Sequence, residues 1–187
     1  RKLKEEGKEA LAAVQTRDLC LQSPNPRVKT NFACYVIRNT YRETALYEEV
    51  ISELCVKGSA SDCMSLFFHL RKQEPDTSKD LQAGSLSLAC KNGDAGGCSL
   101  LGFSFLNGDI VSRDLAQSKT MFKAGCDLLN AEVCAEYADL LGRYTFGMPD
   151  KKELFTVAQR ACQPDGKRIK GDFRSVKTCM TAAEAIA

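Results

Sequence analysis

Apolar residues recur at helical spacing along the chain, and their rhythm follows the cysteines. After the second cysteine of each pair, apolar side chains stand three and seven positions further on, which places them on one face of a helix. The pattern predicts a first helix in each of several similar segments. These apolar pairs are Ile37 and Tyr41, Leu66 and Leu70, Leu101 and Phe105, Tyr137 and Leu141, and Ala182 and Ile186.

A second stripe precedes the first cysteine of each later pair. Apolar or small residues stand four and one positions before that cysteine, so a second helix is expected to end there. Turn residues separate the two stripes, and Gly58 and Gly93 follow the second stripe, with Asp62 placed as a helix N-cap. The second stripe consists of Ile51 and Leu54, Leu86 and Ala89, Phe122 and Gly125, and Ala158 and Ala161.

Together the two stripes form a repeat. The first cysteine of each pair recurs at intervals of 35, 35, 36 and 36 residues, so we predict about nine helices, beginning with one over residues 2–21. Helical hairpins of this size bury both faces only by stacking, which indicates an all-α fold, a right-handed α–α solenoid with about 36 residues and one local disulfide per repeat. We divide the single solenoid domain, 1–187, into an N-terminal helix at 1–22, repeats at 31–58, 62–93, 97–129 and 132–163, and a C-terminal helix at 172–187.

The chain has ten cysteines in regular pairs, a pattern typical of disulfide-bonded proteins of oxidising compartments. Seven residues separate the members of each central pair, enough for a turn that brings both sulfurs within bonding distance. Structural zinc sites favour shorter cysteine spacings, and the single histidine provides no second ligand cluster, so we expect neither metal nor cofactor. Free thiols, or a bond across a whole hairpin, would contradict the pairing that we predict: Cys20–Cys34, Cys55–Cys63, Cys90–Cys98, Cys126–Cys134 and Cys162–Cys179.

The composition of the chain limits the compartments in which the protein can work and the kinds of partner that it can bind. The chain carries 26 Lys and Arg against 24 Asp and Glu, and a net charge of +2 favours neither nucleic acid nor an anionic membrane. No apolar run approaches the roughly 20 residues that span a bilayer. We therefore expect a soluble protein of the periplasm or the extracellular space whose signal peptide was removed, and the mitochondrial intermembrane space is the alternative.

The central part of the chain, residues 55–162, resembles the SEL-like repeat family, which is related to TPR proteins. Within that family it resembles the cysteine-rich branch typified by the Helicobacter cysteine-rich proteins. The unit that begins at Cys63 departs from the pattern, because Leu66 and Phe67 stand in place of Leu-Gly. The best-matching unit contains Cys98-Ser-Leu-Leu-Gly102, Asn107-Gly108, Val111, Asp114 and Phe122-Lys-Ala-Gly-Cys126.

This resemblance implies an adaptor that binds a protein or peptide partner on the concave face of its stacked first helices. Cysteine-rich members of the family that recognise β-lactams imply an alternative, a slow hydrolase with a cell-wall-derived or β-lactam ligand. The sequence contains no Ser-x-x-Lys, Ser-Asp-Asn or Lys-Thr-Gly motif of a serine β-lactamase, and a zinc enzyme would need more than its one histidine. We expect a scaffold rather than an enzyme and predict no catalytic residue.

Candidate contacts follow from helical phase. Residues of the first helices that lie away from the apolar stripe are expected to be exposed and to contact the partner. A second group lies in the basic segment between the last two cysteines, which would suit an acidic partner. The candidates are Arg38, Arg42, His69, Gln73, Ser104, Glu136 and Arg143, together with Lys167, Arg168 and Lys170.

Overall fold

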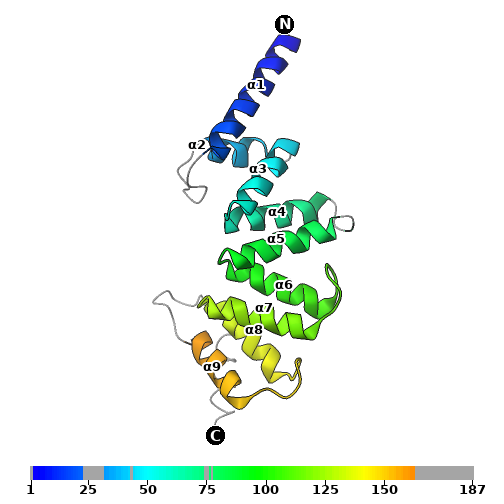
Figure 1. Ribbon diagram of the computed structural model, residues 1–187, viewed down its shortest axis with the longest axis vertical. Coiled ribbons are helices and arrows are strands. Elements are labelled where there is room, and N and C mark those ends of the chain that lie inside the picture. The colour runs from blue at the N-terminus through cyan, green and yellow to red at the C-terminus, as the bar shows by residue number, and fades with distance from the viewer. Residues whose placement is uncertain (1, 23–31, 43, 74–75, 77, 163–187) are drawn as a thin grey trace. The chain divides into compact units, whose positions relative to one another are not determined.

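The computed structural model describes residues 2–22, 32–42, 44–73, 76 and 78–162, with side chains from residue 11 onward. Within these ranges the chain is all-α, as predicted, and none of the helices is long and apolar enough to cross a membrane (Figure 1). The first helix covers the predicted residues 2–21, whereas the division into repeats stays a prediction, and the C-terminal helix predicted at 172–187 lies outside the described residues. The nine helices of the described part are α1 (Lys2–Leu21), α2 (Phe32–Thr40), α3 (Ala45–Val56), α4 (Ala60–Gln73), α5 (Lys79–Lys91), α6 (Ala95–Asn107), α7 (Leu115–Asp127), α8 (Ala131–Gly142) and α9 (Lys151–Cys162).

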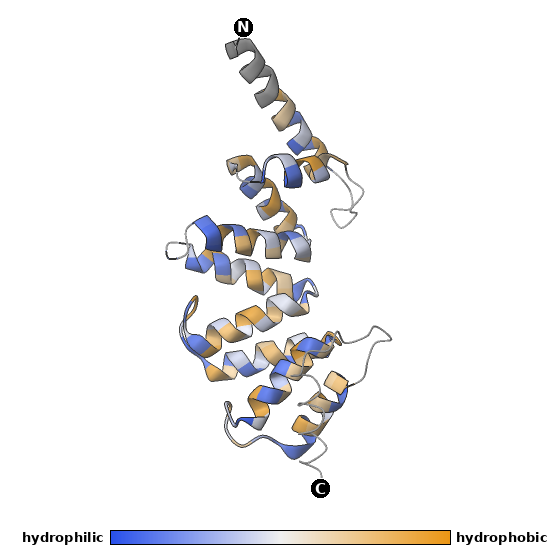
Figure 2. Cartoon of the chain, turned by 180° about the vertical axis from the view of Figure 1, so that it is seen from behind, coloured by the Kyte–Doolittle hydropathy of each residue, from blue (hydrophilic) through white to orange (hydrophobic). Residues whose placement is uncertain are grey.

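The chain divides into two compact units, residues 1–92 and 93–187. In the first unit, helices that are adjacent in sequence pack together: α1 on α2, α3 on α4, and α4 on α5. Apolar and polar residues are interspersed along the coloured helices of Figure 2, so that one face of a helix can be buried. The largest buried cluster of this unit lies among α1, α2, α3 and α4 and consists of Cys20, Cys34, Ile37, Tyr47, Val50, Ile51, Leu54, Leu66 and Leu70.

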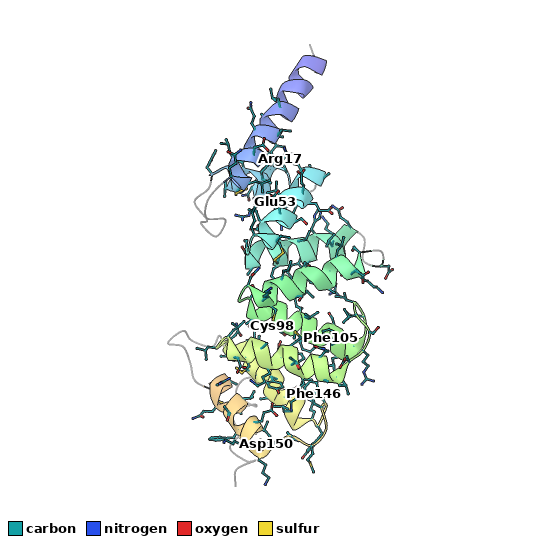
Figure 3. All side chains as sticks on the ribbon, viewed as in Figure 1. Arg17, Glu53, Cys98, Phe105, Phe146 and Asp150 are labelled. Carbon is teal, nitrogen blue, oxygen red and sulfur yellow. A yellow bond between two sulfur atoms is a disulfide. The ribbon has the colours of Figure 1, made fainter. Side chains whose placement is uncertain are left out.

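In the second unit, α7 packs on α6 and α8, and α9 packs on α8. The core is aromatic: the buried ring of Phe122 meets Phe103 edge-on, with centroids 4.8 Å apart, and stacks on Tyr137 at 6.5 Å. Phe146 lies in the turn after α8 (Figure 3). It packs against both Phe122 and Tyr137. Gly102 faces the Phe122 ring so closely that a Cβ there would lie 3.0 Å from two ring carbons.

The turn after the first cysteine of a pair has the same construction three times. The third residue after the cysteine has a positive φ, 99° at Gly58, 91° at Gly93 and 60° at Leu129. This region of backbone space suits glycine, because a Cβ crowds the backbone there. The next residues in two of these turns, Asp94 and Asn130, accept a backbone N–H with a side-chain oxygen and so cap the following helix.

The prediction that Asp62 is a helix N-cap is wrong. Because α4 begins at Ala60, Asp62 lies within the first helical turn, where it is 1% exposed. Its carboxylate accepts two hydrogen bonds from Arg38, at 2.9 and 2.6 Å, and one from the hydroxyl of Ser59. A buried carboxylate needs such a partner, and here the partner comes from α2.

Four of the five predicted disulfides are present, Cys20–Cys34, Cys55–Cys63, Cys90–Cys98 and Cys126–Cys134. The Cα atoms are 4.8 Å apart in the first pair and 4.5 Å apart in Cys55–Cys63 and Cys126–Cys134. Cys162 is also disulfide-bonded, but Cys179 lies outside the described residues, so its pairing stays a prediction. No described cysteine is a free thiol.

Candidate binding cleft

One cleft in the first unit brings together three of the predicted contacts. Arg42, His69 and Gln73 line a cavity of about 460 Å³ between the start of α3 and one face of α4. The residues that complete its wall were not predicted from the sequence. They are Tyr47, Ser65, Phe68 and Lys72.

Helix α4 supplies most of this wall. Ser65, His69 and Gln73 follow one another at four-residue intervals, so they lie along one helix face. Phe68 and Lys72 form the neighbouring row of the same helix. The opposite face of α4 is buried in the core, which fixes the direction in which these two rows point.

The other wall begins in the turn between α2 and α3. Thr44 caps α3 by accepting the backbone N–H of Tyr47 at 3.3 Å, which sets Tyr47 in the first helical turn. The Tyr47 ring meets the ring of His69 edge-on, with centroids 5.3 Å apart. Arg42 lies in the turn just before the cap and is exposed.

His69 is a buried polar group in this wall. It is 9% exposed, so the expectation that it lies at the surface is wrong. Its Nε2 lies 3.4 Å from Oε2 of Glu48 but makes no hydrogen bond. A buried nitrogen without a hydrogen-bond partner costs about 1–3 kcal/mol, so a bound group that supplied one would recover that free energy.

The described lining of the cleft includes two basic side chains. Arg42 and Lys72 are both exposed cations, whereas Glu48, partly exposed beside His69, is the carboxylate nearest to that ring in the described contacts. Phe68 is 57% exposed and adds an apolar surface to the same wall. The described residues therefore give the cleft both basic and apolar surface.

Another predicted contact of the first unit, Arg38, has a structural role. Its guanidinium binds both carboxylate oxygens of Asp62, which joins α2 to α4. Removing this arginine would leave a buried carboxylate with the Ser59 hydroxyl as its remaining described partner. The basic candidates Lys167, Arg168 and Lys170 lie outside the described residues.

The candidates of the second unit are also held by contacts within the fold. Ser104 is 3% exposed, and its hydroxyl donates to a backbone carbonyl one turn earlier, so the expectation that it is exposed is wrong. Glu136 accepts a hydrogen bond from the hydroxyl of Ser99. Arg143, at the end of α8, pairs with Asp139 at 3.0 Å.

The sequence analysis missed a polar cluster in the second unit. The Tyr137 hydroxyl donates to Glu153 at 2.6 Å, and Nζ of Lys119 lies 2.7 Å from the other oxygen of that carboxylate. Burial raises the pKa of Tyr137, and the neighbouring Glu153 raises it further. Burial alone would raise the pKa of Glu153, but the hydrogen bonds from Lys119 and Tyr137 and the lysine charge outweigh it, so this pKa lies below its usual value.

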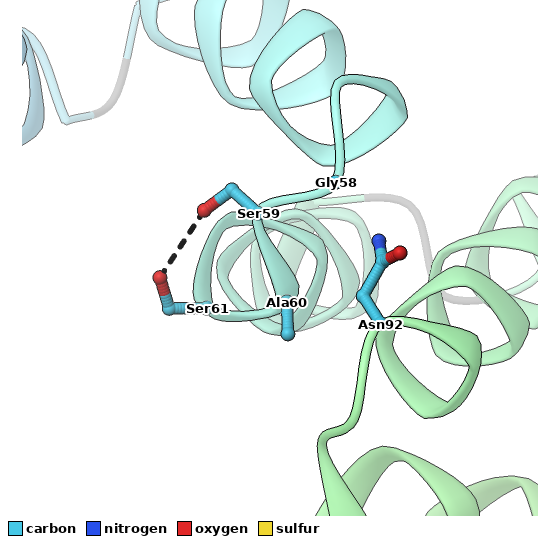
Figure 4. Close-up of a pocket in the computed structure, with 5 residues that line it drawn as sticks. All are labelled: Gly58, Ser59, Ala60, Ser61 and Asn92. Atoms are coloured by element: carbon cyan, nitrogen blue, oxygen red, sulfur yellow. Dashed lines mark hydrogen bonds between the residues drawn. The ribbon is translucent and has the colours of Figure 1, made fainter. Parts of the chain in front are cut away.

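A smaller cavity of about 210 Å³ lies at the start of α4 (Figure 4). The hydroxyls of Ser59 and Ser61 lie 3.3 Å apart at its rim. The described residues of its wall carry no charge that could orient a ligand; they are Gly58, Ser59, Ala60, Ser61 and Asn92. Among the described residues, no three His, Cys, Asp or Glu side chains are grouped so that they could hold a metal ion.

Comparison with known proteins identifies the fold. No family model and no curated protein matches the sequence. A protective antigen present in uropathogenic Escherichia coli strains, which displays an SLR fold, aligns with a TM-score of 0.58 at 14% identity, over 81% of this chain and 37% of that one. A Sel1 repeat protein from Oxalobacter formigenes aligns with a TM-score of 0.55 at 12% identity, over 98% of this chain and 78% of that one.

These two structures show the architecture of the chain. It has the Sel1-like repeat fold, a helical solenoid type, with local disulfides at the turns. The chain spans 37% of the length of the E. coli antigen, so the similarity covers a part of that protein.

Proposed function

We propose that the protein is a binding scaffold that docks a protein partner on the surface of its first helices. The observation that carries the proposal is the cleft of about 460 Å³ on α4, which has an exposed aromatic residue, Phe68, in its wall. Exposed aromatic side chains beside a cavity are typical anchors of protein interfaces. The first helix of the preceding hairpin, α2, adds the exposed rings of Phe32 and Tyr35.

The fold favours this function, because each hairpin of a helical repeat protein contributes a similar surface to an extended binding face. The partner surface that we propose includes α2 and α4 of the first unit. It includes the cleft residues Arg42, His69 and Gln73, which the sequence also indicated.

We further infer that the protein works in an oxidising compartment, the periplasm or the extracellular space. The support is that the described cysteines are all disulfide-bonded, whereas a reducing cytosol keeps such residues as thiols. Acid quenching of producing cells followed by thiol alkylation would test this. We expect no alkylated cysteine in the native protein, and alkylation at most positions would contradict the assignment.

Site-specific photo-cross-linking tests the binding surface. A photoreactive amino acid would replace Tyr35 on α2 or Phe68 on α4 in the full chain, within its native compartment. We expect covalent adducts with the same protein partner from both positions, because both lie on the proposed surface. Leu81 on α5 is a matched control, since it is 63% exposed against 57% for Phe68.

The outcome separates a scaffold from other functions. Equal adduct formation from Leu81 and Phe68, or no protein adduct from either first helix, would overturn the proposal. A scaffold also binds without turnover, so a chromogenic β-lactam should remain intact in the presence of the purified protein. Turnover that survives purification to homogeneity would support the hydrolase alternative instead.

A further inference from the structure

We propose that Met148 is a reversible oxidation site, at which a hydroperoxide converts the thioether into a sulfoxide while the fold stays intact. Met148 lies in the turn between α8 and α9 and is 89% exposed. Methionine sulfoxide is a modification that reductases reverse, so such a site can be oxidised and restored repeatedly. This inference does not depend on the proposed function.

Accessibility separates Met148 from the other methionines that the structure describes. The sequence has four methionines, and Met180 lies outside the described residues. Met64 is partly buried against a core cluster of the first unit, and Met121 on α7 is half-buried. An oxidant in solution therefore reaches the Met148 sulfur without any movement of the chain, whereas the fold partly shields the sulfurs of Met64 and Met121.

Cysteine does not compete for the oxidant in the described part of the chain. A cysteine reacts with peroxide as the thiolate. None of the described cysteines is a free thiol, and a disulfide has no thiolate with which to attack a peroxide. Among the described residues, the thioether of Met148 is therefore the most accessible sulfur that a peroxide can oxidise.

The turn holds Met148 at the surface. Phe146, two residues earlier, packs into the aromatic core of the second unit, and Gly147 turns the backbone with a φ of 87°. Asp150, labelled with Phe146 in Figure 3, accepts the backbone N–H of Lys152 at 3.0 Å and so caps α9. Both flanks of Met148 are thus anchored, and its side chain lies in solvent between them.

The reaction transfers one oxygen atom and two electrons. A lone pair of the Met148 sulfur attacks one oxygen of hydrogen peroxide, the O–O bond breaks, and an S–O bond forms. The departing hydroxide takes up the proton of the transferred oxygen and leaves as water. Sulfur is oxidised and the peroxide is reduced, so the step needs no reagent other than the hydroperoxide.

Oxidation at this position changes the surface rather than the core. A sulfoxide is polar, and in a buried position it disrupts packing. Because Met148 has little packing to lose, we expect the protein to keep its fold when this sulfur is oxidised. The surface of the turn, in which Tyr144 is 62% exposed, becomes more polar until a reductase restores the thioether.

Hydrogen peroxide titration of the intact, disulfide-bonded chain tests the site, with peptide mass spectrometry to assign each added oxygen to one methionine. We expect Met148 to react at least about tenfold faster than Met64 or Met121 in the folded protein. In guanidinium the three should react at similar rates, because the shielding by the fold is then lost. Equal rates in the folded protein, or a preference for Met148 that persists in guanidinium, would overturn the proposal.

Stability and reversal complete the test. The urea midpoint of protein oxidised at Met148 alone should equal that of the untreated protein, and Met148→Leu should abolish the early oxygen uptake without shifting this midpoint. Methionine sulfoxide reductases of both stereospecificities should remove the oxygen from the folded protein. A lowered midpoint on oxidation, or a sulfoxide that the reductases reach only after unfolding, would show that Met148 is a site of damage and not a reversible site.

Discussion

Leu129 holds a backbone conformation that glycine holds at two equivalent turns. Its φ is 60°, and Gly58 and Gly93 occupy the same position after their cysteines. A non-glycine residue in this region is strained, and the Leu129 side chain is 65% exposed, so it has little packing to lose. We expect Leu129→Gly to raise the free energy of unfolding by about 0.5–1 kcal/mol, after allowance for the greater entropy of glycine in the unfolded chain.

Urea unfolding of the oxidised protein measures this change. The adjacent Leu128 has a φ of −76°, so Leu128→Gly relieves no strain and should lower stability. A loss of stability in Leu129→Gly as large as that in Leu128→Gly would show that the Leu129 side chain is needed where it lies.

Gly125 is required by close packing rather than by its backbone angles. A Cβ at this position would lie 2.7 Å from Cγ1 of Val133 and 3.1 Å from Cβ of Cys98. We expect Gly125→Ala to lower the free energy of unfolding by about 1–3 kcal/mol, because the added methyl overpacks the core. Gly84, in the middle of α5, would meet nothing within 4 Å, so Gly84→Ala should instead be stabilising by about 0.5–1 kcal/mol. Thermal unfolding of the two variants side by side tests the contrast, and equal shifts would contradict it.

Single residues show which features of the structure could be predicted from the sequence and which could not. The apolar stripes predicted most of the buried residues, because burial follows helical phase; Tyr41 and Phe105 are half-buried, and Ala182 and Ile186 lie outside the described residues. Asp62 was misassigned because its position in the turn suits a cap, whereas its partner Arg38 stands 24 positions away. Ser104 was expected at the surface because helical phase places it away from the apolar stripe, but its hydroxyl is satisfied by its own helix, which allows burial.

At the scale of helices, polar side chains join elements that stand about one repeat apart. Lys119 and Glu153 are 34 positions apart, and Ser99 and Glu136 are 37 apart, close to the repeat interval of 35 or 36 residues. A comparison of polar residues at this interval would have found both pairs. The cleft is different, because Tyr47 comes from a second helix and lies near His69 of the next first helix. Helical phase therefore indicated Arg42, His69 and Gln73, whose role as contacts stays a prediction, but it did not indicate Tyr47 or the other residues that line the cleft.

Glu153 makes the contact among α7, α8 and α9 dependent on pH. Its pKa lies below the usual value in the folded state, so as the pH falls the unfolded chain takes up the proton first. The stabilisation is therefore complete above the ordinary carboxyl pKa of 4.5 and is lost as the pH falls through the lower folded pKa. We expect the difference in unfolding free energy between wild type and Glu153→Gln to be largest near pH 7 and to shrink towards about pH 3. Urea titrations across this range measure it, and a difference independent of pH would contradict the contact with Lys119 and Tyr137.

At the scale of the molecule, we expect each disulfide to stabilise its own turn independently of the others. Cys55–Cys63 lies in the first unit and Cys126–Cys134 in the second, and each closes a loop with a sequence separation of 8. A loop of that length is expected to contribute about 2–3 kcal/mol through the reduced entropy of the unfolded chain. Replacement of either pair by alanines should lower stability by about that amount, and the four-alanine variant should lose the sum to within about 0.5 kcal/mol.

Guanidinium unfolding of the two pair variants and their combination tests this additivity. A combined loss well above the sum would show that the bonds support one another over a long range.

The sequence predicted the positions of the described disulfides well, because a regular cysteine interval fixes which sulfurs share a turn. Which surfaces face a partner depends on side chains from several helices, and that information is absent from the interval.

The short span of these bonds also affects how the chain is oxidised. Loops of about ten residues close in roughly 10–100 ns, far faster than any thiol–disulfide exchange, so each second cysteine meets its native partner as soon as both are present. When the N-terminal end of the chain emerges first, the disulfides can thus form in sequence order, one turn at a time. Scrambled isomers then have little opportunity to form, and we expect refolding from the reduced state to depend only weakly on a disulfide isomerase.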